Sequence, residues 1–227
     1  MLASALAGAG CKPEQGKALS REAATDLPAR FKSQENVLKP DFSEAAADEK
    51  FQEAIKEAQR LLGAQAHPLK SEVEDKIIKG GVEFDVPHEK IEAILLSIHT
   101  NFLAKGFYIF RYDNNFDEGG HTDRVGLLAT TDMYAVMAAM ETNGDNYDIG
   151  TAGVIEWMKE LQQEQPFILT EIGFDHLGGM FTSPIKNAPD LAKRMYQFCP
   201  DIVDQGVQTV KALAVELEKG KLYFWWD

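Results

Sequence analysis

The sequence contains little cysteine and no long hydrophobic run, and both absences limit what the protein can be. Only Cys11 and Cys199 are present in 227 residues, so a disulfide framework is not in use. No run of about 18 apolar residues exists, so the chain offers no transmembrane helix. The GxxxxGK[ST] phosphate loop, the GxGxxG fingerprint, the GxSxG nucleophile elbow and the HExxH zinc helix are also missing. The sequence therefore matches no familiar catalytic template.

Positive charge is scarce as well. The chain has 23 Lys and Arg against 36 Asp and Glu, which gives a formal net charge of −13. Nucleic acid and anionic membrane surfaces attract Lys- and Arg-rich patches, so this balance argues against both as partners. An acidic surface fits plain solubility, and it also fits docking of a basic protein partner. We expect no nucleic-acid partner and no bound cofactor.

Length and composition predict one compact domain with an appendage. Apolar residues make up 44% of the chain and charged residues 26%, which is ordinary for a globular protein. We predict a leader and disordered linker over residues 1–42, a helical extension over 43–70 and a single α+β domain over 71–227.

The N-terminus allows two interpretations. MLASALAGAGC is apolar and rich in small residues up to Cys11, and a polar stretch follows it. This order resembles the end of a bacterial lipoprotein signal, although no Lys or Arg precedes the apolar run and Gly8 stands where a Leu-like residue is usual. A lipid anchor at Cys11 would place the protein in the cell envelope and would be its contact with the membrane. An untargeted, disordered N-terminus would leave it in the cytoplasm.

Periodicity and turn residues predict the remaining elements. Apolar spacing and capping residues indicate helices over 43–63, 88–106, 131–144, 151–165, 188–199 and 209–219. AHPLK is expected to break the chain after the first helix. Alternation and β-branched or aromatic residues indicate strands over 82–86, 107–112, 125–130, 167–173, 176–183 and 221–226, with Gly178 and Gly179 interrupting the fifth. The mixed order predicts an α+β fold in which helices pack on a mixed or antiparallel sheet that closes on a buried C-terminal strand.

The last predicted strand is apolar on both faces. Leu222, Phe224 and Trp226 alternate with Tyr223 and Trp225. A strand of this kind is typical of a sheet interior that is covered on both sides.

Metal and thiol chemistry each have a weak basis in the sequence. DNNFDEGGHTD begins like an EF-hand loop, but Glu118 stands where that loop requires Gly and Arg124 where it requires Glu, so a turn is the better interpretation and no metal site is predicted. Cys199 with His176 or His121 is a candidate catalytic set, because a thiol needs a basic neighbour. The alternative is that Cys199 is a packed, unreactive thiol.

Two carboxylates in CPDIVDQG are candidates for another role. Asp201 and Asp204 are three residues apart, a spacing at which paired carboxylates on a helix perform acid–base work. The same residues are common caps, and we favour capping of the helix that follows.

Four segments together resemble a known family. NG-x-NYDI at 143–149, PF-x-L at 166–169, FCPDIVDQG at 198–206 and the final LYFWWD are similar to the bacterial domain of unknown function 4253 over about residues 120–227. The resemblance implies a fold unit and a bacterial origin, and it supplies no chemistry. It marks as residues of interest Phe198, Cys199, Pro200, Asp201, Gln205, Gly206, Trp225, Trp226 and Asp227.

We expect the CPDIVDQG and WWD segments to be neighbours in space. The helix at 209–219 and the final strand have comparable lengths, so an out-and-back path returns the chain near its start. A corner of carboxylates and indole rings would then be able to bind a cation or a basic side chain. The predicted binding residues are Asp201, Asp204, Gln205, Trp225, Trp226 and Asp227. The alternative is that the two tryptophans build the core and Asp227 lies in solvent.

The function predicted from these features is a non-enzymatic module that recognises another protein, with an immunity or stress-related role. The alternatives are a hydrolase or thiol enzyme that uses Cys199, and a purely structural module.

Overall fold

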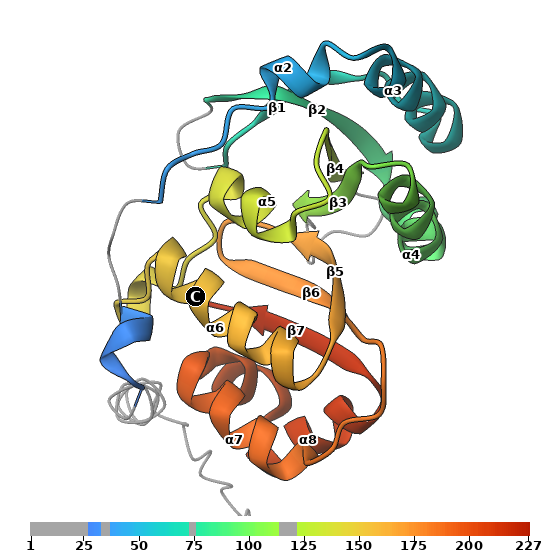
Figure 1. The fold of residues 1–227 in the computed structure, drawn as a ribbon. Helices are drawn as coiled ribbons and strands as arrows, with labels where there is room; N and C mark the ends of the chain where they lie inside the picture. Colours follow the sequence, from blue (N-terminus) through green and yellow to red (C-terminus); the bar gives the residue numbers. More distant parts are fainter. Residues whose placement is uncertain (1–26, 33–36, 73–75, 114–121) are drawn as a thin grey trace, which may run out of the picture.

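The computed structural model describes residues 27–32, 37–72, 76–113 and 122–227. Its centre is an open, mixed sheet of seven strands in the order β1-β2-β4-β3-β5-β6-β7 (Figure 1). Every neighbouring pair is antiparallel except β3 and β5. The α+β prediction is therefore confirmed. The strands are β1 (His67–Lys70), β2 (Ile77–Pro87), β3 (Tyr108–Asp113), β4 (Thr122–Leu128), β5 (Phe167–Ile172), β6 (His176–Phe181) and β7 (Lys221–Trp225).

Helices begin near the residues that the sequence indicates, because side chains there accept backbone hydrogen bonds. Asp132, Asn187 and Thr209 each cap the helix that follows them. The helices are α2 (Ser43–Ala46), α3 (Glu49–Leu62), α4 (His88–Ala104), α5 (Met133–Met140), α6 (Thr151–Glu164), α7 (Ala188–Phe198) and α8 (Val210–Glu218), with short turns η1 (Ala29–Lys32), η2 (Asp145–Tyr147) and the π-type η3 (Ile202–Val207).

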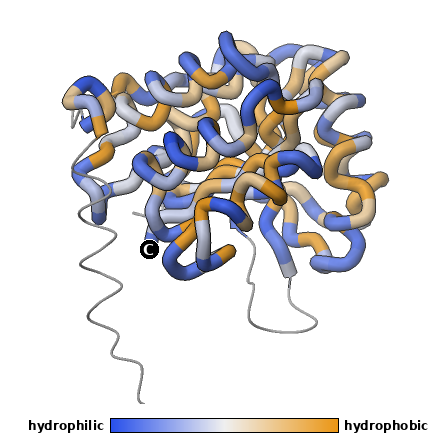
Figure 2. Tube along the Cα trace, turned by 90° about the horizontal axis from the view of Figure 1, so that it is seen from below, coloured by the Kyte–Doolittle hydropathy of each residue, from blue (hydrophilic) through white to orange (hydrophobic). Residues whose placement is uncertain are grey.

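The sheet separates two hydrophobic cores. Tyr108, Phe110 and Tyr112 of β3 belong to a core shared with α5, α6, α7 and α8, whereas Ile109 belongs to a core shared with α3 and α4. This alternation is the period of two that a strand requires. Figure 1 shows α5 to α8 in front of the sheet, with α3 and α4 beside β2, β4 and β3. Figure 2 shows hydrophobic residues gathered along the interior strands and hydrophilic residues on the outer turns.

The first helical segment differs from the prediction. The chain is helical over α2 and again over α3, and Asp48 caps α3 by accepting a hydrogen bond from Lys50 N. The segment AHPLK was expected to break the chain, but His67–Lys70 forms β1 and pairs with β2. Hydrogen bonding to β2 supplies what local propensity lacks.

The glycine pair in β6 also differs from the prediction, because the strand continues through it. A Cβ atom at Gly179 would collide with the Ile168 carbonyl of β5. The glycine therefore permits close approach of two strands without interrupting either.

The prediction that β7 lies inside the sheet is wrong. β7 pairs only with β6 and forms an edge of the sheet. Leu222 and Phe224 are buried against the helices, whereas Tyr223 is 36% exposed and Trp225 is half-buried. One apolar face builds the core, and the aromatic residues on the other face lie at the margin of the sheet.

Candidate functional site

The loop that leads into α6 packs against the end of the chain. Gly144 and Ile149 form a bridge in which Gly144 N donates to Ile149 O at 2.8 Å. A Cβ atom at Gly144 would lie 2.8 Å from the Trp226 ring, which is too close for any side chain. In Figure 1 the C-terminal mark lies beside this loop. Glycine at this position therefore lets the NGDNYDI segment close over the indole.

Asp201 joins this loop to both of the other motif segments. The Tyr147 hydroxyl donates to its Oδ1 at 2.6 Å, and Gln205 Nε2 donates to the same oxygen at 3.0 Å. Asp227 N donates to Oδ2 at 3.0 Å. Asp201 is only 2% exposed, so this buried carboxylate holds three segments together by charge-assisted hydrogen bonds.

The two tryptophans differ in their surroundings. Trp226 is 3% exposed, stacks on Phe224 with centroids 5.7 Å apart, and donates from Nε1 to Phe198 O at 3.3 Å. Trp225 lies on the other face of the strand and is half-buried. The expected proximity of the CPDIVDQG and WWD segments is therefore present, with Trp226 as a core residue of the corner.

The capping interpretation of Asp201 and Asp204 is wrong. The Thr209 side chain caps α8. Asp204 Oδ1 instead accepts a hydrogen bond from the Tyr196 hydroxyl at 3.1 Å. A π-type turn, η3, separates these carboxylates from α8, and the sequence gave no sign of it.

Comparison with known proteins agrees with this geometry. The described family model that matches is a domain of unknown function (DUF4253), over residues 124–227. Residues 124–227 match DUF4253. The boundary expected from the sequence, about residue 120, is close to the observed one. No curated protein and no solved structure shows significant similarity to the chain.

The DUF4253 match begins inside β4, at Arg124. β4 lies between β2 and β3, so its ladder on both sides is completed by residues that precede the match. The N-terminal half therefore supplies the strands and helices on which the first matched strand depends.

Cys199 of the DUF4253 segment is buried and its thiol is engaged. The residue is 0% exposed, and its Sγ donates to Trp225 O at 2.9 Å. Burial raises the pKa of the thiol well above its usual value. A thiol that stays protonated and out of contact with solvent is a poor nucleophile. Its contact with the free edge of β7 instead satisfies a carbonyl that would otherwise be unpaired.

The two histidine candidates have different outcomes. His176 begins β6 and is buried, with Nδ1 3.1 Å from Asp175 Oδ1 and Nε2 without a hydrogen-bond partner. Within the described part of the chain, no hydrogen bond links His176 to Cys199. His121 lies outside the described residues.

Around the same corner, four carboxylates lack cationic partners. Asp145, Asp148 and Asp227 are exposed, and Asp204 is half-buried. Within the ranges that the structure describes, none of the four forms an ion pair. Oδ2 of Asp204 is also buried without a hydrogen-bond partner. The corner is thus locally acidic, and one of its oxygens lacks the donor that a buried acceptor requires.

A second polar cluster, at the junction of β3 and β5, was missed by the sequence analysis. Arg111 Nη1 donates to Asp123 Oδ2 at 2.9 Å and to Glu92 Oε2 at 3.0 Å, and Nη2 lies 2.8 Å from Glu171 Oε1. His88 Nδ1 lies 3.1 Å from the same Asp123 oxygen. Burial alone would lower the pKa of Arg111, but the charge of Glu171 outweighs it and the pKa lies above its usual value. The single charged residue in the aromatic strand FYIFRY was the available signal.

The described residues offer no further class of site. They contain no group of three or more His, Cys, Asp or Glu side chains arranged to hold a metal ion. In the same residues, no helix has both the length and the apolar character to span a bilayer. Cys11 lies outside them, so its lipidation stays a prediction.

Replacing Asp201 with asparagine is expected to lower the free energy of unfolding by about 1.5–3 kcal/mol, because hydrogen bonds to a buried charge are lost or weakened. Urea denaturation measures the change. Asp227→Asn is the matched control, since only the backbone of Asp227 bonds to Asp201 and its exposed side chain should change stability by less than about 0.5 kcal/mol. Equal losses in the two variants would mean that the Asp201 network is not what stabilises the corner.

Proposed function

We propose that this protein is a non-enzymatic module that binds a basic segment of another protein at the acidic corner formed by Asp145, Asp148, Asp204 and Asp227. The observation that carries the proposal is the absence of cationic partners for these carboxylates in the described structure. Elsewhere in the described structure carboxylates are paired, as Glu160 is with Arg30 and Glu164 with Arg194. A lysine or arginine from a partner would supply the missing charge.

The corner is also built to stay in place. Asp201 and Trp226 fasten its three segments to one another and to the core. Preorganised groups lose little conformational freedom on binding, which favours affinity. The net charge of −13 adds long-range attraction for a basic partner and speeds the encounter.

The thiol-enzyme alternative has less support. Cys199 is fully buried and its raised pKa disfavours the thiolate. A nucleophile must reach its substrate, and this sulfur instead donates to Trp225 O. The proposal retains an immunity or stress-related role as its biological context.

A direct test measures binding of a fluorescent Lys- and Arg-rich peptide by anisotropy at low salt. The triple variant Asp145→Asn/Asp148→Asn/Asp227→Asn should bind about tenfold more weakly, a loss of about 1.4 kcal/mol. Asparagine keeps the side-chain shape and suits the positive φ of 60° at Asp148. The fold should therefore be preserved.

The matched control removes the same charge from other elements. Glu49→Gln/Glu89→Gln/Glu218→Gln changes exposed carboxylates on α3, α4 and α8. This variant should retain affinity within about threefold, because charges distant from the contact act only through screened long-range attraction. An equal loss in both triple variants, or no binding by the wild-type protein, would overturn the proposal.

A further inference from the structure

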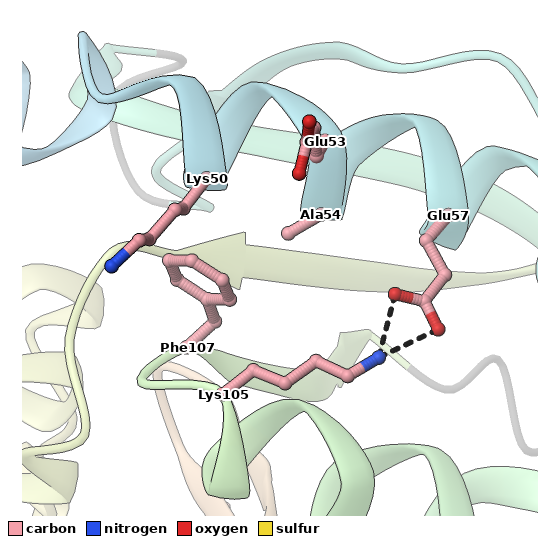
Figure 3. Close-up of a pocket in the computed structure, with 6 residues that line it drawn as sticks. All are labelled: Lys50, Glu53, Ala54, Glu57, Lys105 and Phe107. Carbon is pink, nitrogen blue, oxygen red and sulfur yellow. Dashed lines mark hydrogen bonds and ion pairs between the residues drawn. The ribbon is translucent and has the colours of Figure 1, made fainter.

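A groove lies between α3 and the start of β3, on the part of the chain that precedes the DUF4253 match. Its volume is about 430 Å³. Figure 3 shows the side chains that line it, and they come from α3 and from the turn between α4 and β3. They are Lys50, Glu53, Ala54, Glu57, Lys105 and Phe107.

The floor of the groove is apolar and rigid. Phe107 is half-buried, and its ring packs on Phe51 with centroids 5.4 Å apart. Ala54 is 3% exposed and lies on the side of α3 that faces the groove (Figure 3). An aromatic ring held from below by a second ring offers a flat surface for an apolar or aromatic group.

The charges of the groove are unevenly compensated. Lys105 Nζ donates to both carboxylate oxygens of Glu57 at 2.7 Å. Within the described structure no carboxylate pairs with the Lys50 ammonium. The Glu53 side chain projects from α3 on the side opposite Phe107 in Figure 3. One cation at the end of an apolar floor is therefore left for an external anion.

We propose that this groove binds a small aromatic carboxylate. The aromatic body would stack on Phe107 beside Ala54, and its carboxylate would accept hydrogen bonds from the Lys50 ammonium. A groove of this size is within the range of about 300–1,000 Å³ that is usual for small-molecule sites. An apolar floor with one placed polar group is also their usual construction.

This inference is independent of the proposed function. The groove is formed by α3, α4 and β3, whereas the acidic corner is formed by the segments around η2, η3 and the end of β7. The two sites also select opposite charges. Failure of one proposal leaves the other untouched.

The probe for this test is 2-naphthoate, titrated into the ¹⁵N-labelled full-length protein and followed by NMR chemical shifts. Shifts should concentrate on α3 and on residues next to Phe107. Lys50→Gln should weaken binding about tenfold, since it removes the charge that contacts the carboxylate. 2-Naphthamide, which has the same rings without the charge, should bind the wild-type protein as weakly as 2-naphthoate binds the variant.

The matched control is Lys56→Gln. Lys56 is exposed on the same helix and does not line the groove. This variant should keep affinity within about twofold, because only screened attraction is changed. Equal weakening by Lys50→Gln and Lys56→Gln, or shifts that concentrate away from α3, would overturn the proposal. Unchanged melting temperatures in both variants would show that each remains folded.

Discussion

Replacing Arg111 with methionine is expected to lower the free energy of unfolding by about 3–5 kcal/mol. The Arg111 side chain is 6% exposed and ion-paired to Asp123, which is fully buried, and to Glu171. Methionine fills much of the same volume but leaves the Asp123 carboxylate buried with a large part of its compensating charge removed. Removing one partner of a buried pair is far more costly than removing both.

This loss should be measured by urea denaturation at neutral pH. Arg194→Met is the matched control, because Arg194 also pairs with a carboxylate, Glu164 at 2.7 Å, but its side chain is 39% exposed. Exposed ion pairs contribute about 0–1 kcal/mol, so the control should remain close to the wild-type protein. A loss below about 1 kcal/mol for Arg111→Met would show that the cluster does not fasten β3 to β5.

Replacing Trp226 with alanine is expected to be as destabilising, by about 3–5 kcal/mol. The indole is buried, stacks on Phe224 and contacts Phe198 edge-on with centroids 5.4 Å apart. Its removal leaves a cavity beneath Gly144 and removes the hydrogen bond to Phe198 O. The three segments of the corner would then lose the core to which they are fastened.

Trp225→Ala provides the control at the adjacent residue. It deletes the same number of atoms from the half-buried face of β7. We expect a loss of about 1 kcal/mol, since less apolar surface returns to water and no closed cavity forms. Differential scanning calorimetry of the two variants makes the comparison. A larger loss for Trp225→Ala than for Trp226→Ala would mean that the burial assigned to the two faces of β7 is reversed.

Local features of the sequence were sufficient to predict most of the elements. Asp132, Asn187 and Thr209 cap helices because a short polar side chain satisfies amide groups that the helix leaves free. The alternation in FYIFRY predicts a strand because side chains of a strand point to opposite faces. Such signals act over a few residues, so they can be read before the fold is known.

The partners of the buried charges could not be predicted in this way. Arg111 contacts Glu92, Asp123 and Glu171, which lie on α4, β4 and β5. Asp201 meets Tyr147 and Asp227 from segments 54 and 26 residues away. Nothing local distinguishes these carboxylates from the many that remain in solvent.

The sequence by itself determined the α+β class, the acidic character, the helix starts and the closeness of the CPDIVDQG and WWD segments. It determined them because hydrophobic periodicity, capping chemistry and chain length are local properties. Only the tertiary structure decided that β7 is an edge strand, that Cys199 is sealed against it, and that Asp201 is a buried junction instead of a helix cap. These outcomes depend on which strand pairs with which, and that choice is made by the burial of surfaces distant in sequence.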